Sequence, residues 1–185
     1  MSFTPSSSTS SSTSPPVSSP TKRIAARCTA QARFPSPLGP MLLARTEAGL
    51  AGAWFEAQKW HPEPLDAPER PDDPLLQLAA QQIAEYFAGT RSQFDLPLDL
   101  HGTDFQRSVW LALRGIESGG TQSYAAVARR LGAPLAVRAV GAAVGRNPVS
   151  VIVPCHRVVG TNGSLTGYAG GLERKRALLT LEGVL

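Results

Sequence analysis

The sequence has few of the residues that would place it in several common classes of protein. Only two of its 185 residues are cysteine, Cys28 and Cys155, which excludes a disulfide framework and an all-cysteine zinc site. No apolar run approaches the roughly 18–20 residues that a membrane-spanning helix needs. The first 20 residues are almost all Ser, Thr or Pro and lack the apolar core of a secretory signal, which predicts a disordered tail over 1–22. We therefore expect a cytoplasmic protein without membrane contacts.

Acidic side chains are scarce in the second half of the chain. Residues 1–100 carry 8 basic and 10 acidic side chains, whereas residues 101–185 carry 10 basic and 4 acidic ones. Nine of those ten basic residues are arginine, the side chain best suited to recognising phosphates and bases. This asymmetry indicates one module that binds a polyanion and one that does not, although a solvated basic surface explains the charge equally well.

The first half of the chain after the tail predicts a small sheet and one helix. A proline-rich, acidic surface loop over 56–72 precedes Asp73 and Pro74, which suit the N-cap and first position of a helix that ends at Gly89. Three apolar segments separated by turn residues predict an antiparallel meander: Gln31–Pro35, Pro40–Thr46 and Leu50–Phe55. A polar connector over Asp95–Gly102 then predicts a boundary between domains at 23–100 and 101–185.

The second half predicts mostly helices. Thr103 and Gln106 form a capping box at the start of the first one. Two short helices, Tyr124–Leu131 and Leu135–Gly145, are joined by a three-residue turn with glycine, which is the helix-turn-helix pattern. The second of them has small side chains and one long polar group, Arg138. It suits close approach to another surface or a packed interior, and the arginine argues against full burial.

The rest of the chain predicts a strand, a turn and a last helix. Val149–Val153 predicts a short buried strand, Thr161–Ser164 a tight hairpin, and Leu172–Leu181 the final helix. The predicted fold class is α+β. A three-stranded antiparallel sheet with a helix is followed by a mostly helical, winged-helix-like domain that contains the helix-turn-helix.

Cys155 is the candidate nucleophile. Pro154 keeps the preceding residue extended, so the chain must leave the predicted strand sharply at the cysteine. His156 and Arg157 supply the cationic or proton-accepting character that lowers the pKa of a thiol, and Asn147 can orient a backbone group or a water. Most intracellular cysteines are inert core residues, which is the alternative interpretation of Cys155.

A nucleophilic cysteine needs a base, and the base needs its own partner. Because adjacent side chains rarely point at one spot, we expect His156 to reach the thiol through a water. Glu182 is the candidate partner of the histidine, since it lies in the last turn of the final helix, where the helix dipole disfavours an anion by about 0.3–1 kcal/mol. The alternative for Glu182 is a frayed, exposed helix end.

These residues together resemble a known family, the O6-alkylguanine-DNA alkyltransferases or methylated-DNA–protein-cysteine methyltransferases. The resemblance covers about Ala32 to Gly183. It implies DNA repair by irreversible, single-turnover transfer of an alkyl group from O6-alkylguanine, with O4-alkylthymine as a second candidate substrate, to the protein's own cysteine without a cofactor or metal. The matching segments are Ser123-Tyr124, Arg138-Ala139-Val140-Gly141, Asn147-Pro148, Pro154-Cys155-His156-Arg157-Val158 and Gly167-Tyr168.

The resemblance also implies roles for single residues in the transfer reaction. Cys155 is the alkyl acceptor, His156 is the base that acts through a water, and Glu182 holds that histidine. Asn147 fixes the turn between the recognition helix and the active-site strand. Tyr124 crowds the phosphate of the target nucleotide and donates to guanine N3.

For DNA binding, the resemblance implies a monomer that approaches double-stranded DNA through the minor groove and flips the damaged base. Arg138 fills the gap left by that base, on a helix where Ala139 and Gly141 allow close approach. The remaining residues that the resemblance places at the guanine pocket are Val158, Tyr168, Ala169 and Ser150.

The sequence departs from the family pattern at three positions. Ala169 replaces a serine of many members, so a side-chain bond to O6 is lost. Glu117 replaces the usual proline before the helix-turn-helix, and Ser150 replaces a proline that lines the pocket in some members. The chain also lacks zinc ligands around Cys28. The alternatives to the alkyltransferase are a non-enzymatic winged-helix DNA-binding protein and a Cys-His hydrolase, for which an oxyanion loop is missing.

Overall fold

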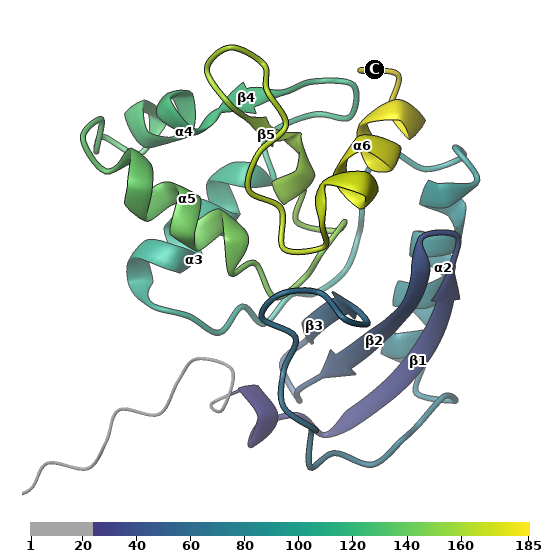
Figure 1. Ribbon diagram of the computed structural model, residues 1–185. Helices are drawn as coiled ribbons and strands as arrows, with labels where there is room; N and C mark the ends of the chain where they lie inside the picture. Colours follow the sequence, from purple (N-terminus) through teal and green to yellow (C-terminus); the bar gives the residue numbers. More distant parts are fainter. Residues whose placement is uncertain (1–23) are drawn as a thin grey trace, which may run out of the picture.

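The first half of the molecule contains the predicted antiparallel meander. The computed structural model describes residues 24–185, and the predicted tail over 1–22 lies outside them. Strands β1 (Ala30–Ser36), β2 (Gly39–Arg45) and β3 (Leu50–Phe55) lie in this order in one sheet (Figure 1). The turn between β1 and β2 needs Gly39, whose φ of 107° is a conformation that glycine adopts without steric cost.

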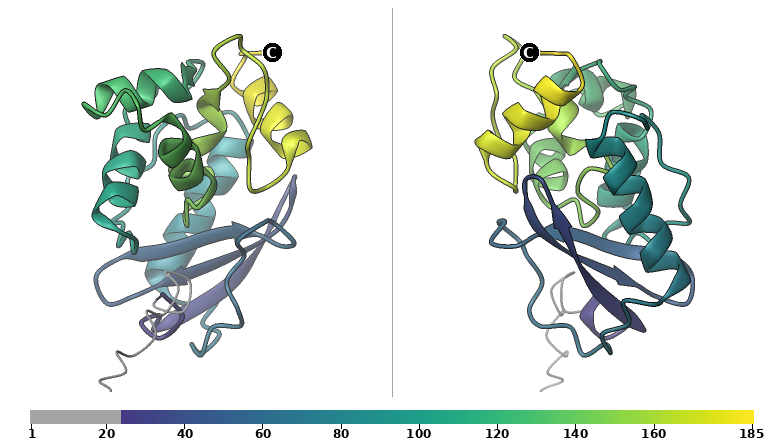
Figure 2. Two further views of the ribbon diagram at one scale, coloured as in Figure 1. Left: turned by 60° about the vertical axis from the view of Figure 1, so that its left-hand side comes forward. Right: turned by 90° about the vertical axis from the view of Figure 1, so that its right-hand side faces the viewer.

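Helix α2 (Pro74–Phe87) covers one face of this sheet (Figure 2). The helix begins where the sequence predicts, because the Asp73 side chain accepts hydrogen bonds from the backbone N–H groups of Leu75 and Leu76. Its buried face includes Ile83 and Tyr86, which pack into the largest apolar cluster. The helix therefore places Tyr86 next to the second half of the chain, where its hydroxyl donates a hydrogen bond to Glu182.

The second half contains the predicted helix-turn-helix and the final helix, which confirms the α+β fold class (Figure 1). The capping box of Thr103 and Gln106 is present at the start of the first helix. The last three helices begin close to where they are predicted, although α5 starts at Val137 rather than at Leu135. The elements are α3 (Asp104–Leu113), β4 (Gln122–Ser123), α4 (Tyr124–Arg130), α5 (Val137–Gly145), η1 (Cys155–Arg157), β5 (Val158–Val159) and α6 (Leu172–Leu181).

The predicted strand over Val149–Val153 is wrong. Only Val149 makes a bridge to β3, at Ala53, and the chain then turns, so that the N–H of Val153 donates to the carbonyl of Val149 at 3.0 Å. Val151 has a φ of 72° inside this turn. The whole segment is buried, and a short apolar run does not distinguish a strand from a buried turn. The chain therefore turns back before it reaches the cysteine.

The predicted hairpin at Thr161–Ser164 is also wrong. The turn itself forms, with Gly163 at a φ of 78° and the N–H of Gly160 donating to the carbonyl of Ser164 at 2.9 Å. However, β5 pairs in parallel with β4, and no strand follows the turn within the described part of the chain. The following segment is held instead by side chains from α4 and α6 that bind the carbonyl of Thr166.

The connector between the two halves is less polar than expected. Leu96 is buried, and the backbone on either side of Leu98 pairs with Leu50 of β3. One apolar cluster contains residues of α2 as well as Trp110 of α3 and Leu178 of α6. The boundary at residues 100 and 101 stays a prediction. Over residues 24–185, no helix combines the length and apolar character that crossing a membrane requires.

Candidate functional site

Cys155 lies at the start of η1, directly after the buried turn. Its thiol is almost inaccessible, with 3% of the residue exposed. The amide of Asn147 donates to the sulfur at 3.1 Å and to the carbonyl of Val153 at 2.8 Å, while its oxygen accepts from the N–H of Val149 at 3.0 Å. One side chain therefore fixes both the shape of the turn and the position of the sulfur.

The surroundings of Cys155 keep it a thiol at rest. Burial raises the pKa of Cys155, against the hydrogen bond from Asn147 and the charge of Lys175. Arg157 is directed to Glu182, and burial lowers the pKa of His156 so that its imidazole is neutral; neither side chain therefore supplies the expected cationic character to the thiol, and the proton-accepting role of His156 stays a prediction. Formation of a thiolate therefore requires removal of the proton within the site.

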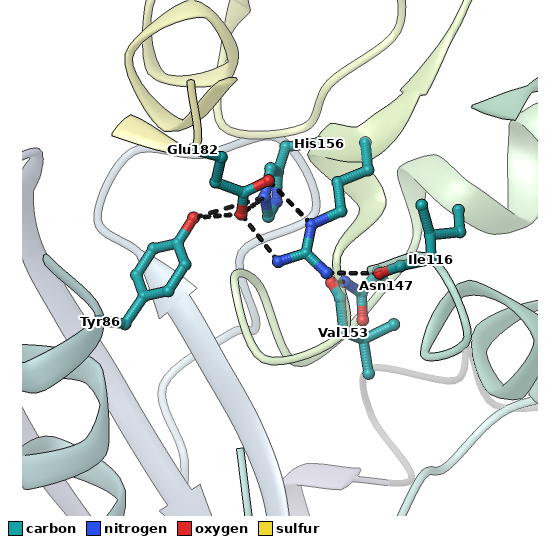
Figure 3. Close-up of polar contacts among 7 residues, drawn as sticks. Tyr86, Ile116, Asn147, Val153, His156 and Glu182 are labelled. Atoms are coloured by element: carbon teal, nitrogen blue, oxygen red, sulfur yellow. Dashed lines mark hydrogen bonds and ion pairs between the residues drawn. The ribbon is translucent and has the colours of Figure 1, made fainter. Parts of the chain in front are cut away.

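Glu182 is held by three side chains (Figure 3). Its Oε1 accepts hydrogen bonds from Tyr86 at 2.7 Å, from Nη2 of Arg157 at 2.8 Å and from Nε2 of His156 at 2.9 Å, and its Oε2 accepts from Nε of Arg157 at 2.9 Å. Burial alone raises the pKa of a carboxyl, but the bonds from His156, Arg157 and Tyr86 outweigh it and lower the pKa of Glu182 to about 2. With 1% of its side chain exposed, this carboxylate is not part of a frayed helix end.

His156 is oriented as a proton acceptor. The residue is fully buried, and Nε2 lies 2.9 Å from the ionised carboxylate of Glu182, so Nε2 carries the proton. Nδ1 is then the nitrogen with a free lone pair. It is buried and has no hydrogen-bond partner among the described residues. A neutral imidazole with a carboxylate behind it can take a proton at Nδ1 and is stabilised once charged.

Lys175 is a buried cation of this region that the sequence interpretation missed. Its ammonium donates to the carbonyls of Val158 at 2.5 Å and Thr166 at 2.7 Å, and it lies 5.9 Å from the ring centroid of Tyr124. Burial lowers the pKa of Lys175 to about 8, and the neighbouring Cys155 opposes this shift. The signal was present in the sequence, because Lys175 precedes two buried leucines of α6 at helical spacing, which places it on their face.

Tyr86 and Arg157 were also missed as partners of Glu182. Burial and Glu182 raise the pKa of the Tyr86 hydroxyl, which stays a donor. Arg157 also donates to the carbonyl of Ile116 at 2.5 Å, just before the exposed Glu117. No sequence pattern connects these positions, because the contacts join residues up to 96 positions apart.

No group of three or more His, Cys, Asp or Glu within residues 24–185 could hold a metal ion.

The residues expected at the guanine pocket lie on segments beside Cys155. The hydroxyl of Tyr124 donates to the carbonyl of Thr166 at 2.9 Å, which ties α4 to the segment before the buried Tyr168. Ser150 is buried in the turn before the cysteine, and its hydroxyl donates to Gln58 at 3.2 Å. The carbonyl of Ala169 accepts a hydrogen bond from the backbone N–H of Lys59 at 2.9 Å, next to Gln58 in the loop after β3. Gln58, which sequence interpretation also missed, thus brings the first half of the chain to the site.

Three of the residues expected to bind DNA, Arg138, Ala139 and Gly141, lie on α5, whereas Tyr124 lies on α4 beside Gly141. Arg138 and Ala139 are exposed, Gly141 is half-buried, and Val140 and Val144 pack inward. A Cβ on Gly141 would meet the Tyr124 ring at ordinary contact distance, so space does not demand glycine there. The structure therefore joins Cys155, Asn147, His156 and Glu182 in one buried group and presents Arg138 to solvent.

Replacing Asn147 by alanine is expected to lower stability by about 1–3 kcal/mol, the cost of one unsatisfied buried group. The buried N–H of Val149 then loses its partner, whereas the carbonyl of Val153 still accepts from the N–H of Cys155 at 2.8 Å. Urea unfolding measures the loss, and a thiol titration should show a higher pKa for Cys155. Wild-type values in both measurements would show that the turn and the sulfur do not depend on this amide.

The fold and the site define a class of protein that joins a helix-turn-helix to a cysteine beside a buried histidine–carboxylate pair. A family model described as 6-O-methylguanine DNA methyltransferase, DNA binding domain, matches residues 104–184. Another, described as 6-O-methylguanine DNA methyltransferase, ribonuclease-like domain, matches residues 31–100.

Known proteins also match over most of the chain. The methylated-DNA–protein-cysteine methyltransferase of Mycobacterium tuberculosis (strain ATCC 25618 / H37Rv) is 50% identical over 147 residues, 80% of this chain and 88% of the relative. That of Methanosarcina acetivorans is 47% identical over 152 residues, 81% of this chain and 96% of the relative. A crystal structure of Mycobacterium tuberculosis OGT in complex with DNA has a TM-score of 0.78 at 45% identity, over 83% of this chain and 92% of that one. The chain belongs to the methylated-DNA–protein-cysteine methyltransferase family.

Proposed function

We propose that this protein repairs DNA by moving an alkyl group from O6 of guanine to the sulfur of Cys155. As a member of its family, the chain takes the alkyl group from methylated DNA onto one of its own cysteines. The guanine lesion, the minor-groove approach and the identity of the cysteine are our proposals. The observation that carries the assignment of Cys155 is the buried Glu182–His156 pair: Nδ1 of His156 is free to accept a proton, and the adjacent cysteine must lose one.

The reaction starts with removal of the thiol proton. This proton passes from Sγ of Cys155, through a water, to Nδ1 of His156, and the resulting imidazolium is stabilised by the Glu182 carboxylate. The sulfur attacks the alkyl carbon while the bond from that carbon to O6 breaks, and the electron pair stays on the guanine. Tyr124 donates to N3 as the leaving base gains charge, in place of its present bond to Thr166.

The product is a thioether on Cys155, and the proposed mechanism has no step that removes it. Each molecule therefore repairs one lesion. The inactive-cysteine alternative, a winged-helix protein that only binds DNA, is favoured by the raised pKa of Cys155 and predicts DNA affinity without thiol consumption. The two are distinguished by titrating free thiols after incubation with duplex DNA that contains O6-methylguanine. Action as a monomer in the cytoplasm stays a prediction.

DNA binding is assigned to the outer face of α5. The target atom is inside the base stack, so the nucleotide must be flipped out at a cost of a few kcal/mol. The small exposed side chains of α5 suit close approach to the minor groove, whose readout is degenerate and fits a protein that acts at any sequence. Arg138 is the long side chain that fills the vacated position in the stack.

Replacing Arg138 by alanine is expected to slow transfer from duplex DNA strongly and leave reaction with a free alkylguanine base nearly unchanged. The free base needs no flipping, so it does not depend on the group that occupies the stack. Single-turnover rates with the two substrates give the comparison. Equal slowing of both would mean that Arg138 supports the fold and does not enter the duplex.

A further inference from the structure

The exposed face of α5 continues past the end of the helix. Going along the chain, exposed positions recur every three or four residues at Leu135, Arg138, Ala139, Ala142 and Arg146. Such spacing puts them on one side of a helix. Arg146 is the residue that follows the last turn of α5, so this outer face ends in a cation.

That cation stacks on an aromatic side chain from the first half of the chain. The guanidinium of Arg146 lies 4.5 Å from the ring centroid of Trp60, and the ammonium of Lys59 lies 5.4 Å from the same centroid. Trp60 is 46% exposed. Neither cation takes part in the ion pairs found among the described residues. The positive charges of Lys59 and Arg146 and the exposed ring of Trp60 thus lie together at the end of α5.

The loop that contains Lys59 and Trp60 has a strained backbone conformation. Ala57 and Trp60 have φ values of 60° and 64°, which are unfavourable for residues other than glycine. Gln58 between them is buried, and its Oε1 accepts from the N–H of Phe55 at 2.9 Å and from the hydroxyl of Ser150 at 3.2 Å. The surrounding structure therefore fixes the loop, which pushes its two outer side chains into solvent.

The same loop borders the proposed pocket. The N–H of Lys59 donates to the carbonyl of Ala169 at 2.9 Å, and the neighbouring Gln58 contacts Ser150. The loop, which follows β3, thus spans from the end of α5 to the segment around Ala169 (Figure 1). The loop therefore connects the outer face of α5 with the residues expected at the guanine pocket.

We propose that Lys59 and Trp60, together with Arg146, form a second contact of the protein with the sugar–phosphate backbone of the bound duplex. The inference rests on the proposed function, because it extends the DNA surface of α5 onto the first half of the chain. Lys59 and Arg146 neutralise backbone phosphates, and the Trp60 ring holds the arginine at the end of the helix. The contact reads no sequence, which suits repair at any site.

The test is DNA binding by the full chain as a function of salt. Each neutralised phosphate contributes about 0.9 to the slope of log K against log salt concentration. Lys59→Gln is expected to lower this slope by about that amount on a long duplex that contains the lesion, and to weaken binding several-fold at low salt. On a short duplex that extends only over α5, Lys59→Gln and the wild type should have the same slope. The matched control is Arg176→Gln, which removes an exposed cation of α6 and should keep the wild-type slope.

A second variant separates the contact from a purely structural brace. Trp60→Phe keeps a ring beneath Arg146 and should retain the slope, whereas Trp60→Ala releases the arginine and should lower it even where thermal unfolding is unchanged. Equal slopes for Lys59→Gln, Arg176→Gln and the wild type overturn the inference. If the wild type neither binds the duplex nor accepts an alkyl group from the free base, the proposed function itself fails. If the base still reacts and only the slopes coincide, the second contact alone is wrong.

Discussion

Replacing Cys155 by serine is expected to abolish alkyl transfer while DNA binding changes by no more than a few-fold. A hydroxyl is far less acidic than a thiol and is a poor nucleophile at neutral pH, so the relay through His156 no longer yields an attacking anion. The amide of Asn147 can still donate to the smaller group, which keeps the turn in place. Transfer is measured as loss of O6-methylguanine from duplex DNA in a single turnover.

Cys28→Ser is the matched control for this substitution. Cys28 lies just before β1 in a separate apolar cluster, and burial, with a contribution from Asp99, raises its pKa to about 11. Its apolar cluster is separate from the one that contains Cys155, so its replacement should leave the transfer rate unchanged. Transfer that survives in the Cys155 variant, or disappears in the Cys28 variant, would show that the wrong cysteine has been assigned.

Replacing Glu182 by glutamine is expected to slow transfer and to destabilise the protein. The carboxylate holds His156 for the reaction, but it also neutralises the buried Arg157, and breaking a buried ion pair costs about 3–5 kcal/mol. The sequence alone predicts little change in stability, because it does not reveal the bonds from Arg157 and Tyr86. Urea unfolding should therefore separate Glu182→Gln from the wild type, and Glu182→Leu should be less stable still.

The stability of the protein at low pH should also depend on the Glu182 carboxylate. The pKa of Glu182 is lowered from 4.5 to about 2 in the folded state, which corresponds to about 3 kcal/mol of stability. Since the folded pKa is the lower one, this contribution is complete above about pH 5 and is lost as the pH falls toward 2. The difference in unfolding free energy between the wild type and Glu182→Gln should therefore shrink from pH 7 to pH 3. A constant difference would contradict an ionised carboxylate.

The rate–pH profile separates the relay from the structural role. Without the carboxylate, His156 is a weaker base, so transfer by Glu182→Gln should be slow at neutral pH and recover partly as the pH rises. The transfer rates of Glu182→Gln and the wild type are compared across the pH range under single-turnover conditions, at a temperature at which both proteins are folded. Profiles of the same shape would mean that Glu182 only stabilises the fold.

Local signals in the sequence predict the fold well. The starts of α2 and α3 follow from Asp73 and Thr103, whose side chains bond to backbone groups two or three residues away. The strand predicted over Val149–Val153 fails because burial there comes from the packing of both halves of the chain, and the Asn147 amide closes a turn instead. Apolar character alone does not specify the backbone path.

The candidate site is predictable only in part for the same reason. Cys155 and His156 are adjacent, so their pattern is visible, and Glu182 is noticed because it sits against the helix dipole. Tyr86 and Lys175 reach this region through the packing of α2 and α6. The raised pKa of Cys155 depends on total burial, which neighbouring residues in the sequence do not reveal.

Mass spectrometry of the full chain after incubation with a duplex that contains O6-methylguanine tests the central claim most directly. The proposed mechanism predicts that each protein molecule gains the mass of one methyl group and that, after proteolysis, this mass is on the peptide that contains Cys155. The peptide that contains Cys28 stays unmodified, and a duplex without the lesion leaves both unchanged. An unmodified Cys155 peptide alongside repaired DNA, or a methyl group on Cys28, would contradict the assignment of Cys155 as the acceptor.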